Sequence, residues 1–229
     1  MTESKLRQLI REAINTADSR RAIAIFRMSS MGGICVIAYD IGELESITRG
    51  TYSHPLGDYN GVIAGVVLSD GKGHRQFEGA NVGECHGSFQ VQRAASNEKG
   101  WGIKVYLAAL DYLEVIASDR FSVTPAAEGA WKKLANYGFV EQEPFDDIRD
   151  PQTPPTRDDC QMHTGRDPAL NSAWRITGPI PADVKGLMAV GEEHRDELEQ
   201  ARLDSIAVRC LCSGFKKLFD DKYGVTVVE

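Results

Sequence analysis

The sequence predicts an α/β fold of the α+β kind: a mixed, mainly antiparallel sheet flanked by helices, with a helical C-terminal extension. Three observations predict it. Runs rich in β-branched residues follow one another between residues 22 and 68, separated by glycine-containing turns, which is typical of an antiparallel meander. After residue 100, apolar residues recur at helical spacing, interrupted by short strand-like runs. The chain has 229 residues, 42% of them apolar and 26% charged, and that length is enough to bury one sizeable core.

The composition narrows the classes of function. The 26 Lys and Arg residues stand against 33 Asp and Glu, and the net charge of −7 repels a polyanion, so we do not expect nonspecific nucleic-acid binding. No apolar run approaches the roughly 18 residues needed to cross a bilayer, so no membrane partner is expected. The five cysteines have an odd count and no repeated spacing, unlike a secreted disulfide framework. These features predict a cytoplasmic protein.

The N-terminal part of the chain is expected to contain a helix and then most of the strands. Apolar residues recur every three or four positions over residues 3–16, which predicts an amphipathic helix in an N-terminal segment of residues 1–18. Gly83 and Gly87 mark places where the last strand bends or bulges. The expected strands cover residues 22–28, 34–39, 62–68 and, as a longer strand, 82–94.

The middle of the chain alternates helices with strands. Thr124 followed by Pro125 has the pattern of an N-cap with proline in the first helical turn. The expected order is a polar turn at 97–102, a buried helix over 103–113, a strand over 118–123, a helix over 126–136 and a returning strand at 137–140.

The composition changes at residue 144. Residues 144–190 are rich in Pro, Asp and Arg and have little periodicity, so we expect an irregular segment there, and a main domain that spans residues 19–143. Apolar residues regain helical spacing within residues 191–229, which predicts a helical extension that packs on the core or on a partner.

Gly100 and Gly102 stand between an expected strand and an expected helix. Glycines in such a turn let backbone N–H groups approach a phosphate, and the helix N-terminus favours an anion. A tight turn without a ligand has the same pattern, so both interpretations stay open. A Walker loop is excluded because Gly73 stands where Ser or Thr is needed, and Val105 stands where a dinucleotide-binding fingerprint has its third glycine.

The residues around this turn carry a resemblance to a known family. The long strand, the turn Asn97-x-x-Gly100-x-Gly102, the buried helix and the short strand resemble the acyl-CoA-binding half of the GNAT superfamily of N-acetyltransferases. The chain also resembles a divergent acetyltransferase-like group encoded by bacteriophages, over about residues 20–160. That resemblance rests on Gly100-Trp-Gly-Ile-Lys-Val-Tyr, Ser118-Asp-Arg, Ser122-Val-Thr-Pro-Ala-Ala, Trp131 and Thr156-Arg-Asp-Asp-Cys160.

The resemblance implies acetyl-CoA, or CoA, as the cofactor. Backbone N–H groups of residues 98–103 would bind its pyrophosphate, and the strand at residues 90–93 would pair with its pantetheine amides. The thioester would lie where that strand splays from its neighbour. The cofactor-binding residues so expected are Gln90, Val91, Arg93, Asn97, Glu98, Lys99, Gly100, Trp101, Gly102 and Ile103.

Such enzymes also need a base for the acceptor amine and an acid for the thiolate. Glu84 and His86 are two residues apart on an expected strand and so share a face. Glu84 is the expected base, acting through water, and His86 is the second choice. The usual tyrosine acid falls on Leu134 or Trp131, so Tyr106, Tyr112 or Tyr137 would have to replace it. No metal is expected, since Cys160 and His163 have no second pair of ligands at matching spacing.

Two functions follow from the resemblance. The first is an acetyl-CoA-dependent N-acyltransferase of phage origin, acting on a primary amine of a small molecule, a protein or a modified base. The alternative is a catalytically silent protein of the same fold, virion-associated or host-interacting, with the terminal helices as docking elements. An opening between residues 88–93 and 118–122 would favour the first; a cleft plugged by Trp101 or Trp131 would favour the second.

Overall fold

The architecture is α+β, with a mixed, mainly antiparallel sheet. A computed structural model describes residues 20–27, 33–43, 61–69, 83–119, 123–147, 156–163 and 167–200. The seven-stranded sheet has the order β1 (Arg21–Arg27), β2 (Ile34–Asp40), β3 (Val62–Ser69), β4 (Phe89–Ser96), β5 (Val115–Ala117), β9 (Ser172–Ile176) and β6 (Val140–Pro144). The helices are α3 (Trp101–Leu113), α4 (Pro125–Leu134), α5 (Ala182–Glu193) and α6 (Arg195–Gln200). Within this sheet, all neighbouring strands are antiparallel except β4 and β5, which are parallel.

The first three strands confirm the predicted meander, with ends within one residue of those expected. Their alternating side chains enter two apolar clusters on opposite faces of the sheet, as a period of two requires. β2 and β3 lie inside the sheet and are buried almost throughout. On one face Ile23 and Val36 join the main core, and on the other Phe26 and Tyr39 join a smaller cluster with Leu198 of α6.

Helix α3, after the glycine turn, confirms the helix predicted over 103–113. Its residues from Val105 to Leu110 are all buried. The expectation of a strand over 118–123 is wrong: β5 covers Val115–Ala117, and the described residues 118, 119 and 123 are not in a strand. The physical reason is Glu114, whose φ of 65° ends the helix abruptly. The apolar residues that follow at once become β5. The helix at Pro125 has its predicted cap, because the Thr124 hydroxyl oxygen accepts from the Ala127 N–H at 3.3 Å.

The expectation that residues 144–190 lack regular structure is wrong. β9 lies between β5 and β6 and pairs with both, so the core does not end near residue 143. Its Trp174 is 1% exposed and belongs to the main core. A second, two-stranded parallel sheet joins β7 (Asp146–Asp147) to β8 (Asp159–Cys160). β9 has only five residues and lies in a region rich in proline and aspartate, so its local sequence gives no clear strand pattern. It is a strand because it pairs with β5 and β6, which are distant in the sequence.

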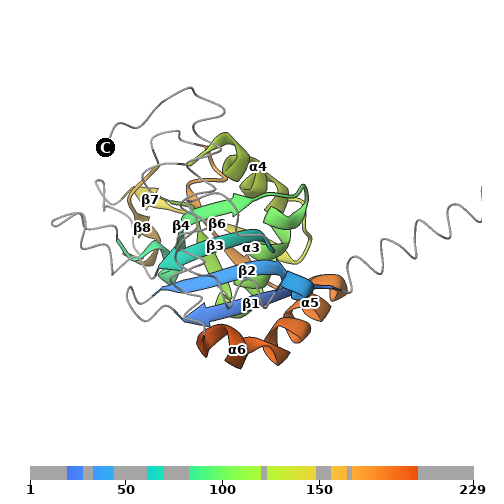
Figure 1. The fold of residues 1–229 in the computed structure, drawn as a ribbon. Coiled ribbons are helices and arrows are strands. Elements are labelled where there is room, and N and C mark those ends of the chain that lie inside the picture. Colours follow the sequence, from blue (N-terminus) through green and yellow to red (C-terminus); the bar gives the residue numbers. More distant parts are fainter. Residues whose placement is uncertain are drawn as a thin grey trace, which may run out of the picture.

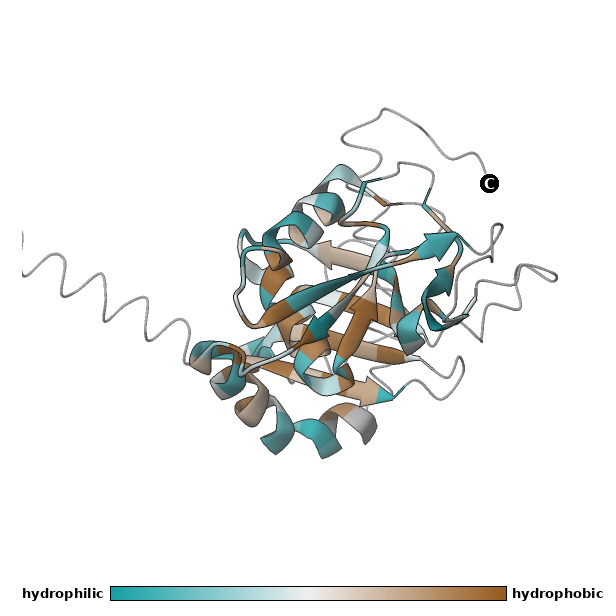
Figure 2. Ribbon diagram, turned by 180° about the vertical axis from the view of Figure 1, so that it is seen from behind, coloured by the Kyte–Doolittle hydropathy of each residue, from teal (hydrophilic) through white to brown (hydrophobic). Residues whose placement is uncertain are grey.

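Helices cover the main core on the face of the sheet that α3 occupies. α3 contacts β1, β2, β3, β4, β5 and β9, and α5 packs on both α3 and β1. α5 approaches β1 so closely that a Cβ on Gly191 would lie 1.9 Å from the Ile23 carbonyl oxygen. Figure 1 shows α5 and α6 beside β1, and Figure 2 shows apolar residues concentrated in the strands and in the helix against them.

Two expected segments lie outside the described residues: the N-terminal helix over 3–16 and the part of the C-terminal extension beyond residue 200. Within the described ranges, no helix has the length and apolar character that a membrane span requires.

Candidate functional site

β4 and β5 start side by side and then separate. They pair only at Phe89 with Ile116 and at Gln90 with Ala117. β4 continues to Ser96, paired with β3 on its other side, while the chain beyond Ala117 leaves the sheet. A cleft of about 350 Å³ occupies this place. The cleft is lined by Val91, Gln92, Arg93, Ala94, Tyr106, Asp119, Val123, Thr124, Ala127 and Trp131.

A β-bulge shapes the β4 wall of the cleft. Val91 pairs with Leu68 and Arg93 pairs with Val67, so Gln92 is the additional residue on β4. A bulge bends its strand and redirects its side chains. In a regular strand, consecutive side chains point to opposite faces, yet four consecutive residues of β4, 91–94, line the same cleft. The bulge lies within these four residues.

Helix α4 forms the opposite wall. Thr124, Ala127 and Trp131 are spaced by three and four residues and therefore share one face of the helix. Trp131 is 1% exposed, lies edge-on to Tyr106 at 5.0 Å between ring centroids and stacks on Trp174 at 6.5 Å. The Trp131 ring is thus part of the wall, and the cleft remains open beside it. Trp101 does not line the cleft.

Tyr106, a lining residue of this cleft, carries a buried polar atom. Its side chain is 2% exposed, and its hydroxyl has no hydrogen-bond partner within the described part of the chain. Burial raises the pKa of this phenol well above its usual value of about 10, because the phenolate would be poorly solvated. The hydroxyl therefore keeps its proton at neutral pH.

The glycine turn lies at the C-terminal end of β4. Gly100 has a φ of 91°, a left-handed conformation that favours glycine, and it is the N-cap of α3 without any side-chain cap. The Gly102 and Ile103 N–H groups belong to the first turn of α3, where N–H groups have no intrahelical acceptor. Asn97 is directed away from this end, since its side-chain amide donates to the Val62 carbonyl at 3.1 Å and anchors the turn to β3.

Charged residues surround the start of α3. Glu98, the carboxylate that would repel a phosphate, is bound by the Arg21 guanidinium at 2.7 and 3.2 Å. Arg21 also lies over the Trp101 ring, 5.0 Å from its centroid, and Lys104 Nζ lies 4.8 Å from the same centroid. Lys104 contacts Asp183 of α5 at 3.1 Å. The negative charge of Glu98 is therefore balanced by Arg21, and the Lys104–Asp183 ion pair connects α5 to the start of α3.

The two expected catalytic residues are not on a strand face. β4 begins at Phe89, and residues 85–87 form a 3₁₀ turn in which Cys85 and His86 have φ values of 48° and 54°. Alternation along a strand therefore does not apply to Glu84 and His86, and neither residue lines the cleft. Glu84 is exposed at the start of the turn, where its carbonyl accepts from the Gly87 N–H at 2.8 Å.

His86 is held by the strand β6. The Pro144 carbonyl can only accept, so the Nε2–H of His86 donates to it at 3.0 Å, and Nδ1 lies 3.6 Å from Glu143 Oε2. Glu143 also receives two hydrogen bonds from Arg175, at 2.8 and 3.1 Å. Those bonds are the largest cause that lowers the pKa of Glu143, and the charges of Arg175, His86 and Arg157 lower it further. Both ring nitrogens of His86 thus face β6.

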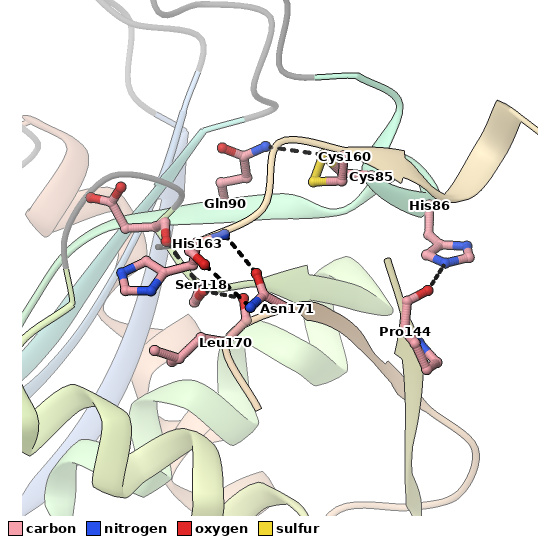
Figure 3. Close-up of a disulfide and its surroundings, with 10 residues drawn as sticks. Cys85, His86, Gln90, Ser118, Pro144, Cys160, His163, Leu170 and Asn171 are labelled. Atoms are coloured by element: carbon pink, nitrogen blue, oxygen red, sulfur yellow. Dashed lines mark hydrogen bonds between the residues drawn. A yellow bond between two sulfur atoms is a disulfide. The ribbon is translucent and has the colours of Figure 1, made fainter. Parts of the chain in front are cut away.

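A disulfide between Cys85 and Cys160 joins this turn to β8, a pairing that the odd count and irregular spacing of the cysteines did not predict. Both residues are buried, and the Gln90 side-chain amide contacts Cys85 Sγ at 3.6 Å (Figure 3). Seventy-five positions separate the two cysteines, and spacing alone gave no signal for the pair. The bond fixes the chain just before β4, beside the two pairs of described residues that join β4 to β5.

The structure divides the expected cofactor residues into two groups. Val91 and Arg93 line the cleft, and residues 97–103 form the turn and helix start at the end of the same strand. Gln90 is buried against the disulfide and does not line the cleft. Sequence analysis did not name Ala94, Asp119, Val123, Thr124 and Ala127 as site residues, and it included Gln92 only within the strand at residues 90–93. The shared helical face of Thr124, Ala127 and Trp131 was a readable signal; the bulge at Gln92 was not.

No protein-family model matches this chain, and no curated protein or solved structure matches it either. The site is therefore described from its own geometry.

Proposed function

We propose that this protein is an acetyl-CoA-dependent N-acyltransferase of the GNAT type that acts on a primary amine. The observation that carries the proposal is the cleft of about 350 Å³ at which β4 separates from β5. The cleft follows the same strand that ends in the glycine turn and the uncapped start of α3. A splay beside this strand is what the family resemblance implies for the thioester.

The residues present fit an acyl-CoA. An extended chain of amides can add to a strand edge through main-chain hydrogen bonds, and residues 91–94 offer the edge of β4 to the cleft. The first-turn N–H groups of Gly102 and Ile103 would hold the pyrophosphate, helped by the helix dipole. Arg21, Lys99 and Lys104 bring positive charge to this turn. Acetyl-CoA supplies an activated acyl thioester when it is bound.

Asp119 is the residue we propose as the base. Of the described residues that line the cleft, it is the only one with a carboxylate, whereas Glu84 and His86 lie elsewhere. In the transfer, the bond from the amine nitrogen to the acyl carbon forms and the carbon–sulfur bond breaks. Asp119 accepts the proton that the nitrogen loses, and the departing thiolate is protonated from solvent.

The arrangement of charges favours a cationic acceptor. The net charge is −7, so a positively charged amine is attracted over the surface as a whole. A carboxylate in the cleft would attract such an amine as its ammonium form; the ammonium gives one proton to solvent before the neutral amine attacks, and Asp119 accepts the second proton as the amide forms. A polyamine, an aminoglycoside and a lysine-containing peptide are the acceptor classes to compare.

A second candidate function has its own support. A protein that binds acyl-CoA without transferring the acyl group needs the cleft and the turn but no base. The distance of Glu84 and His86 from the cleft favours this alternative, because it removes the two groups that the sequence offered for proton transfer.

Release of the CoA thiol, followed with a thiol-reactive dye, tests the proposal with the three acceptor classes. We expect acceptor-dependent release, reduced at least a hundredfold in kcat by Asp119→Asn, as is typical of losing a general base. Asp111→Asn, on the outer part of α3 and 3.9 Å from Lys185, is the matched control and should leave kcat unchanged. Acetyl-CoA binding without release for any acceptor would favour the silent alternative; no binding would contradict both.

A further inference from the structure

The hydroxyl of Tyr106 is a polar atom that packing does not explain. Buried hydroxyls nearly always have a hydrogen-bond partner, and this one has none among the described residues. Phenylalanine at this position would fill the same space and make the same edge-to-face contact with Trp131, without leaving a polar atom unpaired. The hydroxyl therefore costs stability in the unliganded fold and calls for a partner that the described residues do not contribute.

The position of Tyr106 indicates where that partner comes from. Tyr106 is a lining residue of the cleft, together with residues 91–94 of β4. It follows Ile103 by three residues, which places its Cα roughly 4.5 Å further along the axis of α3. A ligand that starts at the N-terminus of α3 and runs back along β4 therefore passes this side chain soon after its phosphate end.

We propose that the Tyr106 hydroxyl donates a hydrogen bond to an amide carbonyl of the pantetheine arm of an acyl-CoA, and that it acts as a positioning residue. This inference rests on the proposed function and deepens it, because it assigns the recognition of the arm to a side chain of α3. The arm contains amide carbonyls, which accept a hydrogen bond from a neutral phenol and cannot donate one back.

The environment of Tyr106 suits a donor and not a proton-transferring acid. Burial disfavours its phenolate, which raises its pKa above the usual value and keeps the proton on the oxygen. Proton transfer from such a phenol to a thiolate is uphill, whereas donation of a hydrogen bond needs no change of charge. We therefore expect Tyr106 to affect binding of the arm, and to affect the rate only through the position of the thioester.

Tyr106→Phe tests this inference, with Tyr112→Phe as the matched control. Tyr112 lies on the same helix and is 43% exposed, so its hydroxyl is already hydrated. The probes are acetyl-CoA, CoA and adenosine 3′,5′-bisphosphate, which lacks the arm. Binding is measured by calorimetric titration or by competition, and folding is measured by the melting temperature of the free protein.

We expect Tyr106→Phe to weaken acetyl-CoA and CoA by the same factor, about five- to tenfold, and to leave adenosine 3′,5′-bisphosphate unchanged. The free variant should melt at a higher temperature than wild type, by roughly 2–4 °C, because an unpaired buried hydroxyl has been removed. Tyr112→Phe should change neither property. Opposite signs of the effects on folding and on binding are not expected of a residue whose role is only structural.

Three results would overturn the inference. Equal affinity of wild type and Tyr106→Phe for CoA would show that the hydroxyl does not contact the arm. An equal loss for adenosine 3′,5′-bisphosphate would place the effect outside the arm. A lower melting temperature for Tyr106→Phe would show that the hydroxyl has a structural partner. If wild type binds none of the three probes at millimolar concentration, the proposed function itself fails, a result distinct from these.

Discussion

Helix α5 provides a test of the fold that needs no ligand. Gly191 on this helix lies so close to β1 that an added Cβ would be 1.9 Å from the Ile23 carbonyl oxygen, 2.5 Å from its carbonyl carbon and 3.1 Å from the Ala24 nitrogen. All three atoms belong to the backbone, so no side-chain rotation relieves the contact. Gly186, on the same helix, has no atom within 4 Å of its corresponding Cβ position.

The two alanine variants should therefore have opposite effects. Replacing a glycine inside a helix by alanine stabilises a protein by about 1 kcal/mol, and we expect Gly186→Ala to raise stability by roughly that amount. In Gly191→Ala, α5 must move away from β1, at an overpacking cost of about 3 kcal/mol, which leaves a net loss of about 2 kcal/mol. At roughly 2–4 °C per kcal/mol for a chain of this size, the melting temperature should fall by about 4–8 °C.

Thermal and urea unfolding of the two variants beside wild type measure this difference. A Gly191→Ala variant that is as stable as Gly186→Ala would refute the reasoning, because it would show that α5 does not lie against β1 as described. The result also matters for the site, since α5 contributes Asp183, the partner of Lys104 beside the glycine turn.

Three further predictions concern the disulfide, the ion pairs of Glu143 and the glycine turn. Replacing both Cys85 and Cys160 by alanine should lower stability by about 2–4 kcal/mol, since the bond closes a long loop, and peptide mapping of the unreduced protein should recover the two residues as one linked pair; separate peptides would contradict the pairing. Because the folded pKa of Glu143 is lowered, its stabilising contribution is complete above its unfolded pKa of about 4.3 and is lost as the pH falls through the folded value. The stability difference between wild type and Glu143→Gln in urea should therefore be present at pH 7 and shrink as the pH falls through the folded pKa of Glu143, and a difference independent of pH would exclude this linkage. Gly100→Glu, which adds strain at a φ of 91° and a negative charge at the start of α3, should weaken acetyl-CoA by at least tenfold, and unchanged affinity would remove the turn from the site.

Local sequence patterns were sufficient for much of the fold. The three strands of the meander and the helix after the glycine turn have strong periodicity, and Thr124 with Pro125 marks the start of α4 unambiguously. The elements that were wrong depend on long-range partners. β9 becomes a strand only because β5 and β6 lie on either side of it. The turn at Cys85–Gly87 interrupts a strand-like sequence because its backbone is held by the disulfide and by β6.

The residues of the candidate site also differ in whether a local pattern or a long-range contact places them. The glycine turn is a local motif and could be located from the sequence, together with Val91 and Arg93 on the strand before it. Asp119 could not, because it reaches the cleft through the separation of β4 from β5, which no local pattern shows. The prediction of Glu84 and His86 as catalytic residues assumes that side chains two apart on a strand share a face. That assumption fails here because residues 85–87 form a 3₁₀ turn and not a strand.

The central claim is that the cleft between β4 and α4 binds an acyl-CoA, and a filled cleft tests it most directly. Ala127→Leu places a larger side chain among the lining residues while keeping a strong helix former on α4. Lys133→Leu, at an exposed position of the same helix, is the control. Calorimetric titration with acetyl-CoA should give micromolar binding for wild type and Lys133→Leu, and binding at least tenfold weaker for Ala127→Leu at an unchanged melting temperature. Equal affinity of all three proteins, or no heat for wild type at millimolar acetyl-CoA, would contradict the claim.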